Sequence, residues 1–196
     1  CSSDLMNGYG SLRWTATSRE YRYGVGALAA QGTPKTFVIA FNPAVTTDGH
    51  LYTMASYPYG ANGAKEELFF NSSGNLVCVS GKYLGSSTWS RDQLVSPGVI
   101  TANAPHYAIV CWGYNTSGTT VYIDGVGTPA MKDDTLNNSD GNSNPAPYVG
   151  NDSTVHGAAA DNYVGDIGEM IMYSKILNSK ELSLLDSYLK KKYAIP

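Results

Sequence analysis

Two carboxylates, Asp166 and Glu169, stand in an otherwise apolar segment of the chain, "YVGDIGEMIMY" at residues 163–173. A carboxylate in such surroundings is catalytic, ligand-binding or structural. Retaining glycoside hydrolysis would need two carboxyl groups only about 5 Å apart. Because side chains alternate between the faces of a regular strand, a separation of three positions places this pair on opposite faces unless a bulge intervenes. We therefore interpret Glu169 as a framework carboxylate, hydrogen-bonded or paired near a junction between sheet and helix.

The other acidic residues offer no better candidate for paired-carboxylate chemistry. Glu66 and Glu67 are adjacent and diverge on a strand, and Asp133 and Asp134 stand in a loop-like segment. The histidines are scattered, and the sequence contains no nucleophile elbow, phosphate loop or Cys/His pair with zinc-ligand spacing. A carboxylate pair assembled from distant strands stays open as an alternative, but the sequence favours a protein that is not an enzyme.

The composition indicates one uncharged, strand-rich domain. A chain of 196 residues can bury a substantial core as a single domain. Its net charge of -3 gives no electrostatic footprint for nucleic acid or an anionic membrane, and no apolar run is long enough for a membrane span. Only 15% of the residues are charged, whereas 21 are Gly and 15 are Tyr. Gly-rich turns between aromatic runs favour an all-β domain with a polar but uncharged surface.

The chain holds three cysteines, Cys1, Cys78 and Cys111, so at least one of them is unpaired. Cys78 and Cys111 stand in strand-like runs and are either two small buried hydrophobes or a disulfide pair. A first residue that is Cys rather than Met indicates a processed chain or a piece of a longer one. The opening "CSS" resembles the mature end of a bacterial lipoprotein, so a lipidated Cys1 is one interpretation.

Short strand-like runs such as "KTFVIAFNP" and "HYAIVCWGY" recur along the chain, separated by turn clusters such as "NSSGN". Because long crossover helices between them are missing, the sheets should be antiparallel. One helix is predicted over residues 178–192, with Asn178 as N-cap and Glu181 as its capping-box partner. From Met170 onward the preceding strand is apolar on both faces, which predicts a second sheet on one face and this helix or a long loop on the other.

Two segments carry a resemblance to a known family. In "YVGDIGEMIMYSKILNSKELSLLDSYLKKKYAI", Gly, Ile and Glu at alternate positions lead into an apolar strand that ends in Tyr, and a helix follows. In "HYAIVCWGYNTSGTTVYIDGVGTPA", a His-containing strand and a Gly-containing turn lead to Tyr-Ile-Asp-Gly. The matching positions are Gly165, Ile167, Glu169, Met170, Met172, Tyr173, Lys175, Leu177, Glu181, Tyr188, Leu189, Lys192 and Tyr193 in the first segment and His106, Gly118, Tyr122, Ile123, Asp124 and Gly125 in the second. Over residues 36–193 the chain resembles the laminin-G-like branch of the concanavalin A-like lectin/glucanase superfamily.

This resemblance implies an all-β fold, an antiparallel two-sheet jelly-roll sandwich with a short C-terminal α-helix. Residues 1–196 would form a single domain, in which 1–35 supply edge strands and 178–192 form the helix. The enzyme branch of the superfamily carries its carboxylates on one strand in a Glu-x-Asp-x-Glu arrangement, and this sequence contains no such triplet. The resemblance implies the fold more strongly than the function, because the fold serves many functions.

Aromatic residues in turn-like, polar stretches are the candidates for a ligand site, because binding residues concentrate in such stretches. Sugars present apolar C–H faces to aromatic rings and hydroxyls to Asn, Asp and Arg. The stretches "SYPYGANG" and "YLGSSTWSRD" supply the candidate ligand-binding residues Tyr57, Tyr59, Asn62, Tyr83, Trp89, Arg91 and Asp92. The alternative is that these rings pack over sheet edges as loop anchors.

An oxygen-rich stretch, "KDDTLNNSDGNSNPAP" at residues 132–147, is the candidate metal site. Calcium takes about 6–8 oxygen ligands from Asp, Asn and backbone carbonyls. The candidate ligands are Asp133, Asp134, Asn138, Asp140 and Asn142. The stretch departs from an EF-hand, because Val149 stands where the closing Glu would be. The family resemblance implies calcium at the rim of the sandwich, and a solvated turn without metal is the alternative.

Together these features predict a non-catalytic, lectin-like carbohydrate-binding domain of an extracellular, cell-surface or virion-borne protein. Its partner would be a glycan or polysaccharide, with calcium as a candidate cofactor and no nucleic acid. One alternative is a structural or decoration protein of a phage or surface assembly, which would bind other proteins through its Tyr-rich, low-charge surface. Another is a glycan hydrolase or lyase with a non-standard site.

Overall fold

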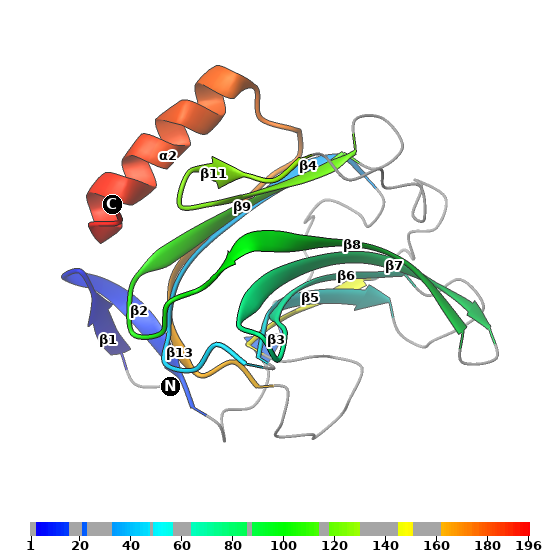
Figure 1. The fold of residues 1–196 in the computed structure, drawn as a ribbon, viewed down its shortest axis with the longest axis horizontal. Helices are drawn as coiled ribbons and strands as arrows, with labels where there is room; N and C mark the ends of the chain where they lie inside the picture. Colours follow the sequence, from blue (N-terminus) through cyan, green and yellow to red (C-terminus); the bar gives the residue numbers. More distant parts are fainter. Residues whose placement is uncertain are drawn as a thin grey trace.

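The computed structural model describes residues 3–15, 21–22, 33–47, 49–56, 64–85, 88–113, 118–129, 145–150 and 162–196. These residues form two antiparallel sheets that face each other, and helix α2 (Ser179–Tyr193), which covers the outer side of the larger sheet (Figure 1). The predicted all-β, two-sheet sandwich with a C-terminal helix is therefore confirmed. The helix begins and ends one residue later than the predicted span.

The larger sheet has seven strands in the order β1-β2-β13-β4-β9-β10-β11. Its strands are β1 (Ser3–Met6), β2 (Tyr9–Trp14), β4 (Lys35–Pro43), β9 (His106–Trp112), β10 (Thr119–Ile123), β11 (Val126–Gly127) and β13 (Gly165–Tyr173). β1 and β2 form a hairpin whose turn residues Asn7 and Gly8 have φ values of 51° and 79°. Both central positions of such a turn need positive φ, and an Asn-Gly pair supplies it at low cost.

The smaller sheet has six strands in the order β3-β12-β5-β6-β7-β8. Its strands are β3 (Tyr21–Arg22), β5 (His50–Ser56), β6 (Ala64–Phe70), β7 (Asn75–Gly85), β8 (Thr88–Val99) and β12 (Pro145–Val149). The first 35 residues contribute β1 at an edge of the larger sheet, β2 beside it and β3 at an edge of the smaller sheet. β7 and β8 pair along most of their length as a long hairpin.

Strand β4 shows why the larger sheet lies between two apolar layers. Its alternate residues Phe37, Ile39 and Phe41 enter the core between the two sheets. Val38 and Ala40 point the other way, into a second core beneath α2. All five side chains are buried. A strand that is apolar on both faces therefore has an apolar partner on both faces, as its composition requires.

Strand β13 follows the same pattern, as its sequence predicts. Met170 and Met172 pack against the core between the sheets, whereas Ile171 and Tyr173 pack against the core beneath α2. The expectation that a second sheet covers one face of this strand and the C-terminal helix the other is confirmed.

Helix α2 starts with the predicted capping box. The Asn178 side chain accepts a hydrogen bond from the Glu181 backbone N–H at 3.0 Å, and the Glu181 carboxylate accepts one from the Asn178 N–H at 2.9 Å. Leu185, Leu189 and Tyr193 are the buried residues of the helix and face the sheet. A helix of this length is marginal in isolation, so this packed face supplies most of its stability.

No disulfide joins the two described cysteines, and both are buried. Cys78 belongs to the core between the sheets, whereas Cys111 belongs to the core beneath α2. The disulfide alternative is therefore excluded for this pair, and both residues act as small hydrophobes. Burial raises the pKa of the Cys111 thiol, although a hydrogen bond from the Thr36 hydroxyl opposes this shift. Cys1 lies outside the described residues.

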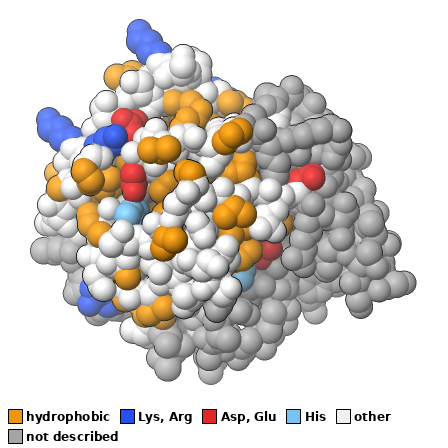
Figure 2. Space-filling model, in the orientation of Figure 1, with side chains coloured by type: hydrophobic (Ala, Val, Ile, Leu, Met, Phe, Trp, Pro, Cys, Tyr) orange, Lys and Arg blue, Asp and Glu red, His pale blue; other side chains and the backbone are white. Residues whose placement is uncertain are grey.

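Charged side chains are sparse among the described residues on the face of the molecule shown in Figure 2. Among the described residues, apolar side chains and the white atoms of the backbone and of uncharged side chains make up most of that face, in agreement with the low-charge surface expected from the composition. Large hydrophobic side chains that are exposed include Tyr9, Leu12, Val45, Val95, Val99, Val126, Leu184 and Tyr188. The last two stand on α2.

Candidate functional site

A bulge in β13 decides where the two candidate acids lie. The register against β4 shifts at Gly168, so that Asp166 lies opposite Asn42 and Glu169 opposite Ala40. Because Asn42 and Ala40 are two positions apart, Asp166 and Glu169 share the face that is turned toward α2. The prediction of opposite faces was wrong, because one extra residue in a strand inverts the alternation that follows it.

Asp166 connects β13 to its neighbour β2. Both of its carboxylate oxygens accept hydrogen bonds from Arg13, the residue directly opposite on β2, at 2.8 Å each. The Tyr163 hydroxyl donates to the backbone oxygen of Asp166 at 3.0 Å. A bidentate Arg–carboxylate pair fixes geometry as well as charge. Asp166 therefore fastens β2 to β13.

Glu169 connects the sheet to the helix. Its carboxylate accepts hydrogen bonds from Tyr188 and Lys192 at 3.1 Å and from Tyr193 at 3.4 Å. The Lys192 ammonium also lies 5.3–5.4 Å from the ring centroids of Tyr9, Tyr188 and Tyr193. Hydrogen bonds to Tyr188 and Glu169 hold the pKa of Lys192 well above its ordinary value. Burial and the charge of Glu169 raise the pKa of Tyr193 to about 12. The expectation that Glu169 is hydrogen-bonded and paired near a junction between sheet and helix is confirmed.

The six-stranded sheet has an inner face, which meets the other sheet, and an outer face, which is turned away from it. The two faces carry different rows of side chains. The row that enters the core between the sheets consists of the directly paired residues Leu68, Cys78 and Leu94. One position along each strand, Glu67, Val79 and Gln93 are likewise paired directly and form the next row. Because side chains alternate along a strand, this second row lies on the outer face. Glu67 and Val79 are buried there, whereas Gln93 is exposed.

A second bulge assembles a polar cluster on this outer face. The register of β5 against β6 shifts at Leu51, so that His50 lies opposite Phe69 and Thr53 opposite Glu67. His50 and Thr53 therefore share the outer face although they are three positions apart. The His50 ring stacks on Phe69 with centroids 4.9 Å apart, and its Nε2 lies 3.3 Å from a Glu67 carboxylate oxygen. We call His50, Thr53, Glu67 and Phe69 the outer-face cluster.

Thr53 Oγ1 and His50 Nδ1, both buried, are among the polar atoms of the outer-face cluster that lack hydrogen-bond partners among the described residues. A buried polar atom without a partner costs roughly 1–3 kcal/mol, so most such atoms in native proteins are satisfied by protein, water or ligand. The cluster meets solvent through His50, whose side chain is 12% exposed, whereas Thr53 has no exposed surface. The cluster can therefore donate and accept hydrogen bonds beside an aromatic ring.

The predicted ligand-binding residues on the β7–β8 hairpin are brought together in part. Tyr83 lies directly opposite Trp89, and Arg91 lies opposite Gly81, two residue pairs further from the turn. The sequence interpretation expected a loop here, but these residues belong to paired strands. The remaining predicted residues, Tyr57, Tyr59 and Asn62, lie outside the described part of the chain.

Asp92 stands on the other side of this hairpin. It lies opposite Ser80, which in turn lies opposite Glu66. That row faces the larger sheet, because Glu66 forms an ion pair with Lys35 of β4 at 2.7 Å, and neither side chain has any exposed surface. Asp92 therefore lies on the inner face of the six-stranded sheet and not on its outer face. The predicted divergence of Glu66 and Glu67 is confirmed.

The family-matching residues His106 and Asp124 form a hydrogen-bonded unit at the β9–β10 pair. His106 Nδ1 lies 2.6 Å from the Asp124 carboxylate, and Nε2 donates to the Thr101 carbonyl at 3.0 Å. The Tyr107 N–H donates to the other Asp124 oxygen at 2.9 Å. Burial lowers the pKa of His106, but the Asp124 carboxylate and the Thr101 carbonyl outweigh it, so the net shift is upward. This unit joins strand to turn.

The candidate calcium ligands Asp133, Asp134, Asn138, Asp140 and Asn142 lie outside the described residues. Within the described ranges, no three His, Cys, Asp or Glu side chains come together as a metal site would require. The helix in the described part of the chain is too short and too polar to cross a membrane.

The two facing sheets, their strand order and the covering helix define the fold class, a concanavalin A-like jelly-roll sandwich. No family model matches the chain, and no curated protein matches it in sequence. Domain 4 of AbnA, an extracellular GH43 arabinanase from Geobacillus stearothermophilus solved with arabinotriose, aligns at a TM-score of 0.66 and 15% identity, over 90% of this chain and 76% of that one.

Two further solved structures share the fold. The Ruminococcus gnavus IT-sialidase CBM40 bound to α2,3-sialyllactose aligns at a TM-score of 0.62 and 14% identity, over 81% of this chain and 84% of that one. The LG4-5 domains of the mouse laminin α1 chain align at 0.60 and 14% identity, over 92% of this chain but only 46% of that one. The chain is thus similar in fold to carbohydrate-binding modules and to laminin G domains.

Proposed function

We propose that this domain binds carbohydrate, without cleaving it, through the outer face of the six-stranded sheet. The observation that carries the proposal is the outer-face cluster, in which buried Thr53 Oγ1 and His50 Nδ1 have no partner among the described residues. Sugar hydroxyls donate and accept hydrogen bonds, so they match both atoms. Similar structures solved with arabinotriose and with sialyllactose support the choice of ligand.

The β7–β8 hairpin extends this surface in the proposal. The paired positions of Tyr83 and Trp89 and the nearby Arg91 supply residue types that suit sugar rings and hydroxyls. Gln93, further along β8, is exposed on the same outer face as the cluster. A site that starts at the cluster and runs along the hairpin would take an oligosaccharide rather than a single sugar.

The neighbours of Glu67 support binding without cleavage. Its direct partners across the sheet are Thr53 and Val79, neither of which is a carboxylate. Glu66 lies on the opposite side and is paired with Lys35. Glycoside hydrolysis usually needs two carboxyl groups flanking the scissile bond. The described part of this face therefore favours a lectin-like role over the hydrolase alternative.

The proposal places the domain on an extracellular, cell-surface or virion-borne protein, and it keeps calcium as a candidate cofactor. The calcium part depends on the oxygen-rich stretch at residues 132–147. If calcium orders the rim of the site, a chelator such as EDTA will weaken glycan binding, and Asp140→Asn will weaken it in the same way. Equal affinity with calcium and with EDTA would remove calcium from the proposal.

Substitution of Thr53 by Val tests the site itself. Val has the shape of Thr and lacks the hydroxyl, so Thr53→Val should leave the free energy of unfolding unchanged or raise it. Loss of one hydrogen bond should weaken glycan binding roughly 3–10-fold. Isothermal titration with a glycan that the wild-type domain binds measures the second effect, and thermal unfolding measures the first.

Thr36→Val is the matched control, because Thr36 is equally buried but its hydroxyl is engaged. It donates to the Lys175 carbonyl at 2.9 Å and accepts from the Leu177 N–H at 3.1 Å. This variant should lower stability and leave glycan affinity at the outer face unchanged. Loss of stability without loss of affinity in Thr53→Val would show that the cluster is structural.

A further inference from the structure

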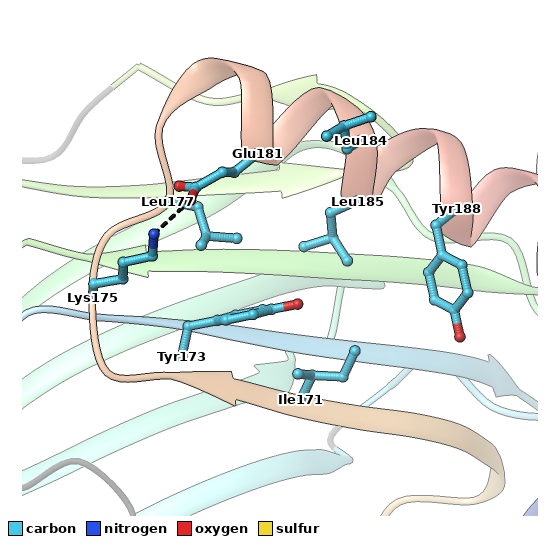
Figure 3. Close-up of a pocket in the computed structure, with 8 residues that line it drawn as sticks. All are labelled: Ile171, Tyr173, Lys175, Leu177, Glu181, Leu184, Leu185 and Tyr188. Atoms are coloured by element: carbon cyan, nitrogen blue, oxygen red, sulfur yellow. Dashed lines mark hydrogen bonds and ion pairs between the residues drawn. The ribbon is translucent and has the colours of Figure 1, made fainter.

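A groove of about 540 Å³ runs between helix α2 and the outer side of the seven-stranded sheet (Figure 3). Its lining consists of Ile171, Tyr173, Lys175, Leu177, Glu181, Leu184, Leu185 and Tyr188. Sites for small ligands typically have volumes of about 300–1,000 Å³ and mostly apolar walls with a few polar groups. The groove has these properties, and it lies on the opposite side of the sandwich from the outer-face cluster.

The floor of the groove presents an aromatic ring with a free hydroxyl. Tyr173 lies along the floor, below Leu177 and Leu185, and its hydroxyl points along the floor toward the middle of the groove (Figure 3). That hydroxyl makes no hydrogen bond with any described residue. The floor therefore offers a ring face and one hydrogen-bonding group.

The two ends of the groove differ. At one end, Lys175 and Glu181 form an ion pair at 2.5 Å, and their side chains are 57% and 34% exposed. The pKa of Glu181 lies below its ordinary value because Lys175 and the Asn178 N–H donate to it, so the pair is charged but neutral overall. At the other end, Tyr188 offers only its ring, since its hydroxyl is bonded to Glu169.

The walls of the groove supply exposed apolar surface. Leu184 is 64% exposed and Tyr188 is 43% exposed, although both stand beside the groove. Large apolar side chains that are exposed together around a groove mark an interaction site more often than isolated ones do. A ligand that fills the groove would cover part of both residues.

We infer that this groove is a second carbohydrate site, selective for a neutral pyranose that carries a methyl group. The ring faces of Tyr173 and Tyr188 take the apolar C–H face of the sugar, and the leucines take the methyl group. Adjacent hydroxyls of the sugar donate to Glu181 and accept from Lys175, and the Tyr173 hydroxyl reaches the ring substituents. An acidic sugar gains nothing here, because Glu181 already neutralises Lys175. The inference deepens the proposed function and depends on it.

A pair of glycosides that differ at one atom tests the inference. Methyl α-L-fucopyranoside carries a methyl group at C5, whereas methyl α-L-galactopyranoside carries a hydroxymethyl group there. The titration is followed in methyl spectra of the domain labelled at Ile, Leu and Val. Ile171, Leu184 and Leu185 report on the groove, and Val79 reports on the outer face. We expect shifts at the groove residues, with the fucoside bound roughly 3–4-fold more tightly, the gain for burying one methyl group.

Two variants locate the contact. Tyr173→Phe should weaken fucoside binding roughly 3–10-fold through loss of one hydrogen bond, and Leu184→Ser should weaken it roughly 3–5-fold through loss of apolar contact. Val126→Ser is the matched control, since Val126 is 60% exposed and does not line the groove. It should leave the affinity unchanged.

The outcomes separate this inference from the proposed function. Shifts confined to Val79 and its neighbours would overturn the groove site and leave the outer-face proposal standing. Equal affinity for the two glycosides would overturn the methyl selectivity. Absence of shifts at the groove residues, at glycoside concentrations in the millimolar range, would overturn the groove site. The outer-face proposal concerns an oligosaccharide, and the glycan titration of Thr53→Val decides it.

Discussion

The hydrogen bonds that Glu169 accepts beneath helix α2 allow the framework interpretation to be tested quantitatively. Glu169→Gln keeps the shape of the side chain but removes the charge that faces Lys192. In the native protein the carboxylate accepts from Tyr188, Lys192 and Tyr193, and the side chains of Glu169 and Lys192 are only 22% and 21% exposed. A hydrogen bond to a charged group contributes roughly 1.5–3 kcal/mol, and partial exposure together with the remaining amide oxygen reduces the loss to about 1–2 kcal/mol.

Thermal unfolding followed by circular dichroism measures this loss. For a chain of this length, about 1–2 kcal/mol lowers Tm by roughly 3–6 °C. Glycan affinity at the outer face should stay unchanged, because the Glu169 carboxylate lies beneath the helix and not in the outer-face cluster. Lys191→Gln is the control: Lys191 is exposed one residue away, and its change should alter stability by less than about 0.5 kcal/mol.

A double-mutant cycle isolates the ion pair itself. Lys192→Met removes the ammonium and keeps the stem, and the coupling between Glu169→Gln and Lys192→Met should be about 0.5–1.5 kcal/mol. An unchanged Tm in Glu169→Gln together with a complete loss of glycan binding would refute the framework reasoning. It would return Glu169 to the functional residues.

Two other predictions concern ionisable groups. The pKa of His106 is raised in the folded state, so its pairing with Asp124 stabilises the fold fully below the unfolded-state pKa of about 6.5, and this stability is lost as the pH rises through the raised pKa. In Asp124→Asn, which keeps a residue suited to the same turn, the fall in the free energy of unfolding between pH 6 and pH 8 should be flatter. Urea titration at each pH measures it. Lys35→Met should cost about 3–5 kcal/mol by removing the buried cation that faces the Glu66 carboxylate, and Lys35→Met with Glu66→Leu should restore most of that loss. A Lys35→Met variant as stable as the wild type would contradict the second prediction.

The sequence predicts the sandwich and its helix because local and long-range signals agree there. Asn178 and Glu181 have the spacing of a capping box, and the structure shows both of its hydrogen bonds. The apolar residues on both faces of β13 require two packing partners, and the second sheet and the helix are those partners. These signals depend on spacing within one segment, so a single sequence is sufficient to interpret them.

The alternation of side chains fails where a strand contains an extra residue. At Gly168 the bulge brings Asp166 and Glu169 to one face, against the regular alternation. A glycine inside a strand is a recognised signal for a bulge, so this error was avoidable. The Asn7–Gly8 turn of the first hairpin is a similar signal that the sequence interpretation passed over.

The outer-face cluster could not be found in the same way. The bulge at Leu51 leaves no signal in the sequence, since Leu is an ordinary strand residue with no turn preference. His50 and Thr53 meet Glu67 only through the pairing of two strands, and the polar character of the site appears only when burial is known. Residues of this kind carry no motif, because their proximity is a property of register and not of spacing.

The central claim, that this domain binds carbohydrate, is tested most directly on a glycan array. The purified domain is applied to neutral and acidic glycans, once with calcium and once with EDTA. The account predicts binding to a related group of glycans, and weaker binding to the same group by Thr53→Val, a variant that melts no lower than the wild type. An array without signal in both conditions would contradict it.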